Sequence, residues 1–517
     1  ILGTPTTTDT FYAAINPADV SVTNVEQIII TQQAYLKAPN AESGDTFGRM
    51  VAISGDTIVI ASPSEGSNQT TITNGTTASS DNSALNSGAA YVFVRTGLTW
   101  FQQAFLKASN ADSGDVFGEY GVAIDGNTIV VGTNRESSNQ STITNGTTAS
   151  SDNSALNAGA AYVFVRSGTT WSQQAYLKAP NSETNDSFAY SLAVSGDAIV
   201  VGAYSEDSNQ TTITSGTTAS TDNSVSGSGA AYVFVRSGTT WSQQAYLKAP
   251  NAGASDQFGR SVYISGDIIV VGADSEDSNQ TTVTNGTTTS SDNSMGNTGA
   301  AYVFVRSGTT WTQQAYLKAP NADASDRFGD SVAISGDTIV VGAIDEDSNQ
   351  TTVTNGSTAS SDNSLNFAGA VYVFVRSGTT WSQQAYLKPP NPESVDRFAQ
   401  HALSISGDTI VAGAYGEDSN QTIITNGTTA SSDNSAAEAG AAYVFVRNGT
   451  TWSHVSYLKA SNAEADDKFG ATVSVSADTI IVGALGEDSN QTTITNGTTA
   501  SSDNSASLAG AAYVFTK

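Results

Sequence analysis

The chain has 517 residues, of which 13% are charged, about half of the roughly 25% typical of globular domains. Its 48 acidic and 20 basic side chains give a net charge of −28, which disfavours nucleic acid and anionic membrane surfaces as partners. The absence of cysteine excludes disulfides and thiol chemistry, the two histidines exclude a multi-histidine metal site, and no apolar run is long enough to span a membrane. Since the chain starts at Ile1 without a basic leader, we expect a mature extracellular protein whose signal peptide has been removed.

Residues 1–26 precede the repeats described below and have no counterpart elsewhere in the chain. Within them, Thr10–Val22 has the apolar positions of a strand. One interpretation is a flexible leader. The other is a strand that adds to the sheet edge of a neighbouring molecule, which would join copies head to tail into a filament or sheath.

The rest of the chain, residues 27–517, consists of seven copies of one unit. The Tyr of an AYVF or VYVF string recurs every 70 or 71 residues, and so does a Phe followed by Gly or Ala. These tyrosines are Tyr91, Tyr162, Tyr232, Tyr302, Tyr372, Tyr443 and Tyr513, and the phenylalanines are Phe47, Phe117, Phe188, Phe258, Phe328, Phe398 and Phe469.

Each unit is predicted to form four β-strands. In the fourth copy these are Phe258–Ser265, Ile268–Ala273, Gly299–Arg306 and Trp311–Ala319, rich in β-branched and aromatic residues. A two-residue turn, Gly266-Asp267, joins the first two strands, and a long polar tract joins the second to the third. The strands are apolar on both faces, which indicates that each sheet is covered on both sides by other sheets.

The two ends of the chain complement each other. Ile28–Ala38 reads as a fourth strand with no third strand before it, and the last copy stops after its third strand. Pairing Ile28–Ala38 with Gly510–Thr516 would close a ring and remove an exposed sheet edge. We therefore predict an all-β fold, a seven-bladed β-propeller of four-stranded antiparallel blades closed by an N-terminal strand, in preference to an open solenoid.

The FG that opens a unit, the VGA that ends its second strand and the GAAYVF of its third strand resemble the FG-GAP repeat family, the building block of the integrin α-subunit propeller. The likeness is greatest to integrin-α-like propellers of prokaryotic extracellular proteins. It implies a seven-bladed propeller outside the cell with a role in adhesion or protein interaction. The family's Asp-rich calcium loop between strands one and two is absent, since that place holds only a short turn such as Gly336-Asp337.

The polar tracts and the loops between blades are expected to share one acidic face of the ring. We considered a calcium site there, if a tract folds into a hairpin about Asn355-Gly356 and brings its acidic ends together. The alternative is that these carboxylates only cap turns. The candidate ligands are Glu346, Asp347 and Asp362, with the repeat equivalents Glu206, Asp207 and Asp222.

The tracts also carry Asn-x-Ser/Thr sequons, which are acceptors for glycans in a secreted protein. An Asn-rich tract yields sequons by chance, and repetition multiplies them. The candidates are Asn68, Asn139, Asn209, Asn279, Asn349, Asn420 and Asn490 in NQT or NQS, and Asn74, Asn145, Asn285, Asn355, Asn426 and Asn496 in NGT or NGS.

Few residues break the repeat. The asymmetric candidates form no recognisable acid–base or nucleophile set; they are Arg49, Tyr120, Tyr190, Arg260, Arg327, Arg397 and His401. We expect His401 to face solvent, or else to line the channel on a bulged strand, and His454 to lie on an outer edge. The Lys of each YLK and the Arg of each FVR are expected to extend toward water or to meet nearby carboxylates.

Three functions follow from these observations. The first is a non-enzymatic extracellular propeller for adhesion, which binds a protein or glycan through its loop-rich acidic face. The second is a structural subunit of a surface filament that polymerises through residues 1–26. The third is a carbohydrate-active enzyme with paired carboxylates, which the near-identical copies disfavour. We expect no cofactor, with calcium as the one candidate ion.

Overall fold

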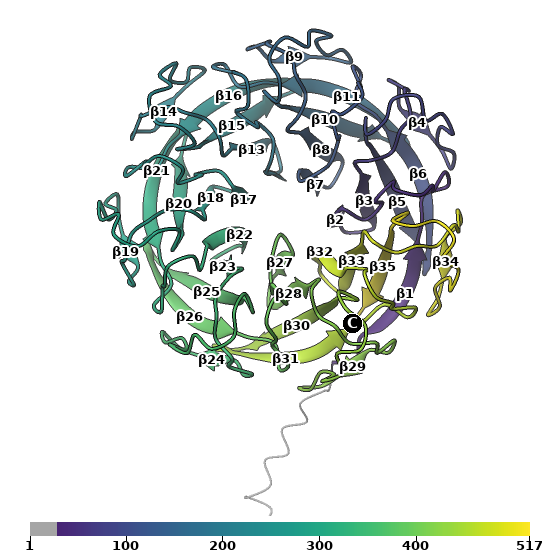
Figure 1. The fold of residues 1–517 in the computed structure, drawn as a ribbon. Coiled ribbons are helices and arrows are strands. Elements are labelled where there is room, and N and C mark those ends of the chain that lie inside the picture. Colours follow the sequence, from purple (N-terminus) through teal and green to yellow (C-terminus); the bar gives the residue numbers. More distant parts are fainter. Residues whose placement is uncertain (1–27) are drawn as a thin grey trace, which may run out of the picture.

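The described part of the chain, residues 28–517 of a computed structural model, forms seven antiparallel sheets around a central axis (Figure 1). This confirms the all-β, seven-bladed propeller. We number the blades 1 to 7 in the order of their innermost strands, from β2 in blade 1 to β32 in blade 7. Residues 28–517 contain no helix, and so none that is long and apolar enough to cross a membrane. The predicted extension, residues 1–26, lies outside the described residues.

The innermost strand of each blade lines the axis, and the second strand pairs with it. The second strands are buried along their whole length, because both of their faces are covered by neighbouring blades. The innermost strands are β2 (Met50–Ser54), β7 (Val122–Asp125), β12 (Leu192–Ser195), β17 (Ser261–Ser265), β22 (Phe328–Ser335), β27 (Leu403–Ser406) and β32 (Phe469–Ser476). The second strands are β3 (Thr57–Ser62), β8 (Thr128–Thr133), β13 (Ala198–Ala203), β18 (Ile268–Ala273), β23 (Thr338–Ala343), β28 (Thr409–Ala414) and β33 (Thr479–Ala484).

The third and fourth strands form the outer half of each blade, and in blades 1 to 6 a tight turn joins them. A bulge interrupts their register in all seven blades. The third strands are β5 (Ala89–Thr96), β10 (Ala160–Ser167), β15 (Ala230–Ser237), β20 (Ala300–Ser307), β25 (Ala370–Ser377), β30 (Ala441–Asn448) and β35 (Ala511–Thr516). The fourth strands are β6 (Thr99–Leu106), β11 (Thr170–Leu177), β16 (Thr240–Leu247), β21 (Thr310–Leu317), β26 (Thr380–Leu387), β31 (Thr451–Leu458) and, in blade 7, β1 (Thr31–Leu36).

The prediction of four strands in each blade needs correction, because each sheet has five. Two residues of the polar tract pair with the fourth strand at the outer edge of the blade, where Figure 1 shows them on the periphery. The predicted hairpin about Asn355-Gly356 is wrong, because Asn355 pairs with Ala385 of β26. The two ends of the tract still approach each other, since the N–H of Leu365 donates to the carbonyl of Asp347. The fifth strands are β4 (Thr73–Asn74), β9 (Thr144–Asn145), β14 (Thr214–Ser215), β19 (Thr284–Asn285), β24 (Thr354–Asn355), β29 (Thr425–Asn426) and β34 (Thr495–Asn496).

The N-terminal strand closes the ring, as predicted. β1 pairs antiparallel with β35, with Tyr35 opposite Tyr513 and Gln32 opposite Phe515. In Figure 1 the first strand of the chain lies beside the last one in blade 7. Blade 7 thus has the same strand order as the other blades, although its fourth strand comes from the opposite end of the chain.

Adjacent blades approach each other closely at the FG motif. Gly510 of blade 7 has a φ of 78° and bridges to Phe47 of blade 1. A Cβ on Gly510 would lie 2.0 Å from the carbonyl oxygen of Phe47, so only glycine permits this contact. The ring of Phe47 then packs edge-on against Tyr91, with centroids 5.3 Å apart.

Polar contacts connect the outer strands of neighbouring blades. The indole N–H of Trp171 in blade 2 donates to the side-chain oxygen of Gln103 in the blade 1 bulge, at 2.8 Å. The backbone N–H of Trp171 donates to Oδ1 of Asn74 in β4, and Nδ2 of Asn74 donates to the carbonyl of Trp171. We call this pair of hydrogen bonds the Asn clasp. The other clasps join Asn145 to Trp241, Asn285 to Trp381, Asn355 to Trp452, Asn426 to Ile30 and Asn496 to Trp100.

Two interfaces depart from this arrangement. In blade 7 Ile30 stands where the other fourth strands have Trp, and in blade 6 Val455 stands where the others have the accepting Gln. Ile30 and Val455 belong to one hydrophobic cluster, so the polar pair has been replaced by an apolar pair. In blade 3 the clasp residue is Ser215, and among the described residues no clasp joins it to Trp311.

Candidate functional site

The departures from sevenfold symmetry gather at one end of the central channel. Two residues after the strand-one Phe, the seven copies carry six different residue types. This position lies at the end of the channel from which the polar tracts leave, because Ser261 pairs with Gly272 at the end of β18. In blade order the residues are Arg49, Glu119, Tyr190, Arg260, Asp330, Gln400 and Ala471.

Aromatic and cationic side chains from four successive blades form a continuous column there. Tyr120 and Tyr190 stack with centroids 4.4 Å apart and an interplanar angle of 23°. The guanidinium of Arg49 lies 4.7 Å from the Tyr120 centroid, and that of Arg260 lies 4.5 Å from the Tyr190 centroid. Both cations therefore contact the electron-rich faces of the tyrosine pair.

The column continues into a buried acidic group. Arg260 Nε lies 3.8 Å from Asp330 Oδ1 and 4.0 Å from Asp274 Oδ2, distances longer than a hydrogen bond. Asp330 is fully buried, yet neither of its carboxylate oxygens has a hydrogen-bond partner among the described residues. Burial raises the pKa of Asp330, and burial with the neighbouring Asp330 raises the pKa of Asp274 to about 6. A buried carboxylate without a hydrogen-bond partner, such as Asp330, is typical of functional sites.

Two one-residue insertions bring Tyr120 and His401 together. The second and sixth copies have nine residue steps from Phe to the turn, Phe117 to Gly126 and Phe398 to Gly407, where the other copies have eight. The rings of Tyr120 and His401 meet with centroids 5.7 Å apart. His401 Nδ1 lies 3.7 Å from Asp330 Oδ2. Burial, aided by Arg260 and Arg49, lowers the pKa of His401 well below its usual range, so the imidazole is neutral at pH 7.

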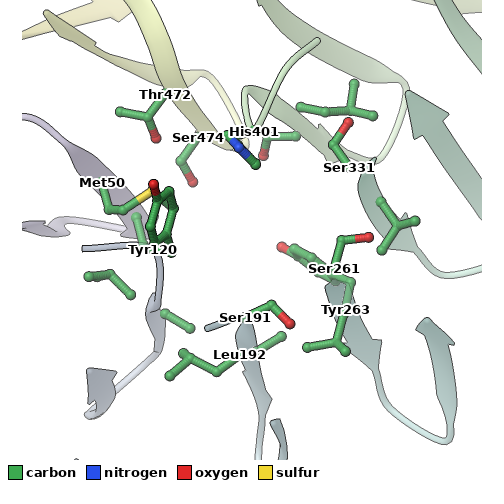
Figure 2. Close-up of a pocket in the computed structure, with 18 of the residues that line it drawn as sticks. Met50, Tyr120, Ser191, Leu192, Ser261, Tyr263, Ser331, His401, Thr472 and Ser474 are labelled. Atoms are coloured by element: carbon green, nitrogen blue, oxygen red, sulfur yellow. The ribbon is translucent and has the colours of Figure 1, made fainter. Parts of the chain in front are cut away.

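A cavity of about 160 Å³ extends from these side chains along the innermost strands (Figure 2). The hydroxyls of Ser191, Ser261 and Ser331 lie on its wall and donate to carbonyls of the next blade. Tyr263 lines it at a strand position where every other copy has Ala or Ser, and it narrows the channel. We call this cavity, with Arg49, Tyr120, Tyr190, Arg260, Asp330 and His401, the channel site.

The outcome for the asymmetric candidates is mixed. The structure brings five of the seven into the channel site, while Arg327 and Arg397 lie beside it, with Arg327 Nε 3.5 Å from Asp345 Oδ2. His401 lines the channel, as in the second of the two interpretations. His454 lies in the outer strand β31, as expected, where it is buried and packs against the rings of Tyr443 and Phe445.

Sequence reasoning missed Glu119, Asp274, Asp330 and Tyr263. Glu119 and Asp330 occupy the same variable position as Arg49 and Arg260, so a comparison of that one column across the copies would have found them. Acidic residues are common throughout the repeats, so the residue types of Glu119 and Asp330 alone did not indicate a functional role.

The carboxylates proposed as calcium ligands serve separate purposes. Glu346 is buried, with Oε2 3.0 Å from Nζ of Lys388 and Oε1 accepting from the Tyr386 hydroxyl at 2.7 Å. Asp347 accepts the N–H of Phe367, and Asp362 accepts the N–H groups of Asn349 and Ser364. Glu206, Asp207 and Asp222 are placed in the same way in blade 3. The hydrogen bonds of Asp347 and Asp362 are those of turn capping. Residues 28–517 contain no group of three or more Asp, Glu or His that could hold a metal ion.

The ends of the strands bear out the expected contacts with carboxylates. Each YLK lysine is buried against the first Glu of a tract, and in blades 1 and 3 to 6 the FVR arginine lies against the Asp of the turn between the first two strands, as Arg306 does against Asp267. The lysine pairs are Lys37–Glu487, Lys107–Glu65, Lys178–Glu136, Lys248–Glu206, Lys318–Glu276, Lys388–Glu346 and Lys459–Glu417.

The two sets of sequons differ in their surroundings. Nδ2 of Asn68, in an NQT sequon, donates to the exposed hydroxyl of Ser83 within its own tract. Nδ2 of Asn74, in an NGT sequon, donates to the carbonyl of Trp171 in the next blade as part of the Asn clasp. The NQT and NQS asparagines therefore lie on the surface of one tract, while the NGT and NGS asparagines connect two blades.

Comparison with known proteins identifies the repeat. No curated protein matches the chain. The sequence model of the FG-GAP repeat matches seven segments, residues 30–93, 100–164, 171–234, 241–304, 311–374, 381–445 and 452–515. Each segment begins near the start of a fourth strand and ends in the third strand of the next blade, so the match covers every blade. The chain therefore belongs to the FG-GAP repeat family.

Proposed function

We propose that the protein is a non-enzymatic recognition propeller that acts outside the cell and binds a protein or glycan partner. Its binding face is the one that carries the polar tracts and the channel site. The observation that carries this proposal is the convergence of non-repeated residues: copies that are nearly identical elsewhere place different side chains around one channel end. A rigid scaffold with a variable end is the usual arrangement of a binding site.

The contacts within the channel site support binding in preference to catalysis. Asp274 and Asp330 both lie near the same guanidinium, that of Arg260, so they act as its counter-ions. The neutral His401 contacts Tyr120 and Asp330. Placement outside the cell is supported by family membership and the Asn-rich tracts. The alternative of a filament depends on residues 1–26, which lie outside the described residues, and stays a prediction.

The test is a binding survey of the full chain on arrays of glycans and of secreted and cell-surface proteins. Tyr120→Ala changes the channel site, and Arg306→Gln changes the opposite end of a blade. We expect saturable binding by the unaltered chain and by Arg306→Gln, and a loss of at least tenfold for Tyr120→Ala. Binding by none of the three, or equal losses in both variants, would refute a recognition role for this face.

A further inference from the structure

We infer that the channel site binds the terminal ring of an acidic carbohydrate, a single pyranose that carries a carboxylate. The inference rests on the proposed function and names its ligand class. It depends on the juxtaposition of three tyrosines and two arginines in an outer pocket of the site, which faces the polar tracts. Tyr120, Tyr190, Tyr204, Arg135 and Arg260 line this pocket, which has a volume of about 320 Å³.

The first argument is the distribution of positive charge. The chain has a net charge of −28, and six of its eleven arginines belong to the FVR motif at the opposite rim. The other five arginines lie near the ends of first or second strands that face the polar tracts. Two of them follow a strand-one Phe, two precede one, and one follows the end of a second strand, so all five surround the same channel end. They are Arg49, Arg135, Arg260, Arg327 and Arg397.

Arg135 and Arg260 both keep donor groups for a ligand beside their acidic neighbours. Arg135 is half exposed and makes one ion pair, with Glu119 at 3.0 Å. Arg260 Nε is buried and has no hydrogen-bond partner among residues 28–517. The pocket therefore offers two guanidinium groups to an anion in an otherwise acidic molecule.

The second argument is the aromatic wall. Tyr190 stacks on Tyr120 and meets Tyr204 edge to face, with centroids 4.6 Å apart. The three tyrosines therefore form one aromatic cluster that borders the pocket with ring edges and hydroxyl groups, which suits a ring that has both apolar and polar substituents. Asn157 and Ser187 also line the pocket and add donors and acceptors for ring hydroxyls.

The third argument is size. A cavity of roughly 150 Å³ accommodates one six-membered ring. The outer pocket, at about 320 Å³, has room for one ring with its carboxylate and hydroxyls but not for several rings in a row. It opens on the tract face, so a longer chain would extend outward from its bound end.

The experiment is calorimetric titration of the full chain at low ionic strength with five probes: glucuronate, its neutral methyl ester, glucose, acetate and inorganic phosphate. Glucuronate carries both the ring and the charge. We expect it to bind saturably, and each of the other four to bind at least tenfold more weakly. Equal binding of glucuronate and its ester, or of phosphate and glucuronate, would overturn the inference.

Variants keep the test independent of folding. Arg135→Gln removes a half-exposed guanidinium with a single partner and should weaken glucuronate binding about tenfold, which corresponds to about 1.4 kcal/mol. The matched control Arg306→Gln removes the same charge at the opposite rim and should leave binding unchanged. Unaltered binding in Arg135→Gln would contradict the inference. If no probe binds while an array partner is still lost in Tyr120→Ala, the ligand class is wrong and the proposed function stands.

Discussion

The side chains of Lys37 and Glu487, 450 residues apart, form a buried ion pair with Nζ 2.9 Å from Oε2. The hydroxyl of Tyr35 donates to the same carboxylate at 2.7 Å. In the six other blades the same lysine–glutamate pair joins residues of one continuous stretch of chain, as Lys248 and Glu206 do in blade 3. Ring closure therefore needs no special contact: the ordinary pair of a blade is divided between the two ends of the chain.

The first prediction concerns this pair. Lys37→Met leaves Glu487 buried without its cation, which costs about 3–5 kcal/mol of unfolding free energy. Lys248→Met should cost the same, since its surroundings are equivalent. The double variant Lys37→Met/Glu487→Gln should recover part of the loss, because the amide still accepts from Tyr35. Guanidinium denaturation measures all three, and an unchanged midpoint for Lys37→Met would contradict the closure described here.

The second prediction uses the missing Asn clasp. Ser215→Asn supplies the two hydrogen bonds to Trp311 that the other interfaces have, and should raise the unfolding free energy by about 1–2 kcal/mol. Asn285→Ser is the matched control: it removes the clasp to Trp381 and should lower stability by a similar amount. The comparison is made on unglycosylated protein by thermal and chemical denaturation. A destabilising Ser215→Asn would show that Ser215 has another role.

The third prediction concerns pH. Burial raises the pKa of seven aspartates that follow the fourth strands, to about 7 in Asp45, Asp115, Asp256 and Asp467 and to about 8 in Asp186, Asp326 and Asp396. An unfolded aspartate releases its proton near pH 4. Between about pH 4 and pH 7 the folded state binds more protons than the unfolded state, so stability falls as the pH rises.

Other titratable groups make stability increase with pH, but fewer of them titrate between pH 4 and pH 7. The pKa values of His401 and His454 are lowered by burial, that of His454 to about 4, so both favour folding as the pH rises to 6.5. Hydrogen bonds lower the pKa of Asp81 and its equivalents, whose contribution is lost only below about pH 4. We expect a higher melting temperature at pH 5 than at pH 7, with a shallower dependence in Asp256→Asn. A melting temperature that increases from pH 5 to pH 7 would contradict these shifts.

The fourth prediction distinguishes the sequons. When a glycosylating enzyme acts on the folded protein, we expect glycans on NQT asparagines such as Asn68 and none on NGT asparagines such as Asn74, because Nδ2 of Asn74 is engaged with the next blade. Mass spectrometry of glycopeptides gives the occupancy at each site. Ser215→Asn creates an NGT sequon and serves as a control, since its new asparagine should also stay unmodified. Equal occupancy of both sets in stable protein would show that the clasp opens.

The repeat made most of the fold predictable. The spacing of the AYVF and FG motifs gave the number of blades, and the second strand Ile268–Ala273 was predicted with its observed bounds. The fifth strands were missed because two residues, Thr-Asn, carry no periodic signal. They pair with β26 and its equivalents only because the outer edge of the blade is already in place.

The channel site was predictable only in part. Five asymmetric residues could be recognised in the sequence because the copies are otherwise nearly identical: Arg49, Tyr120, Tyr190, Arg260 and His401. The sequence did not predict that these side chains contact one another. Tyr120 and His401 are 281 positions apart in sequence, and one inserted residue in the second copy and one in the sixth copy bring their rings together. A carboxylate such as Asp330 gives no sign in the sequence that its oxygens are buried without partners.

The amino-acid sequence by itself determined the sevenfold architecture and its closure, because a hydrophobic pattern repeated at constant spacing leaves each sheet with two apolar faces that only neighbouring sheets can cover. Tertiary structure decided which side chains work together. The closed ring brings the seven strand starts to a single axis, so residues from six different blades come into contact there, and lysines that look exposed in the sequence become buried partners of glutamates.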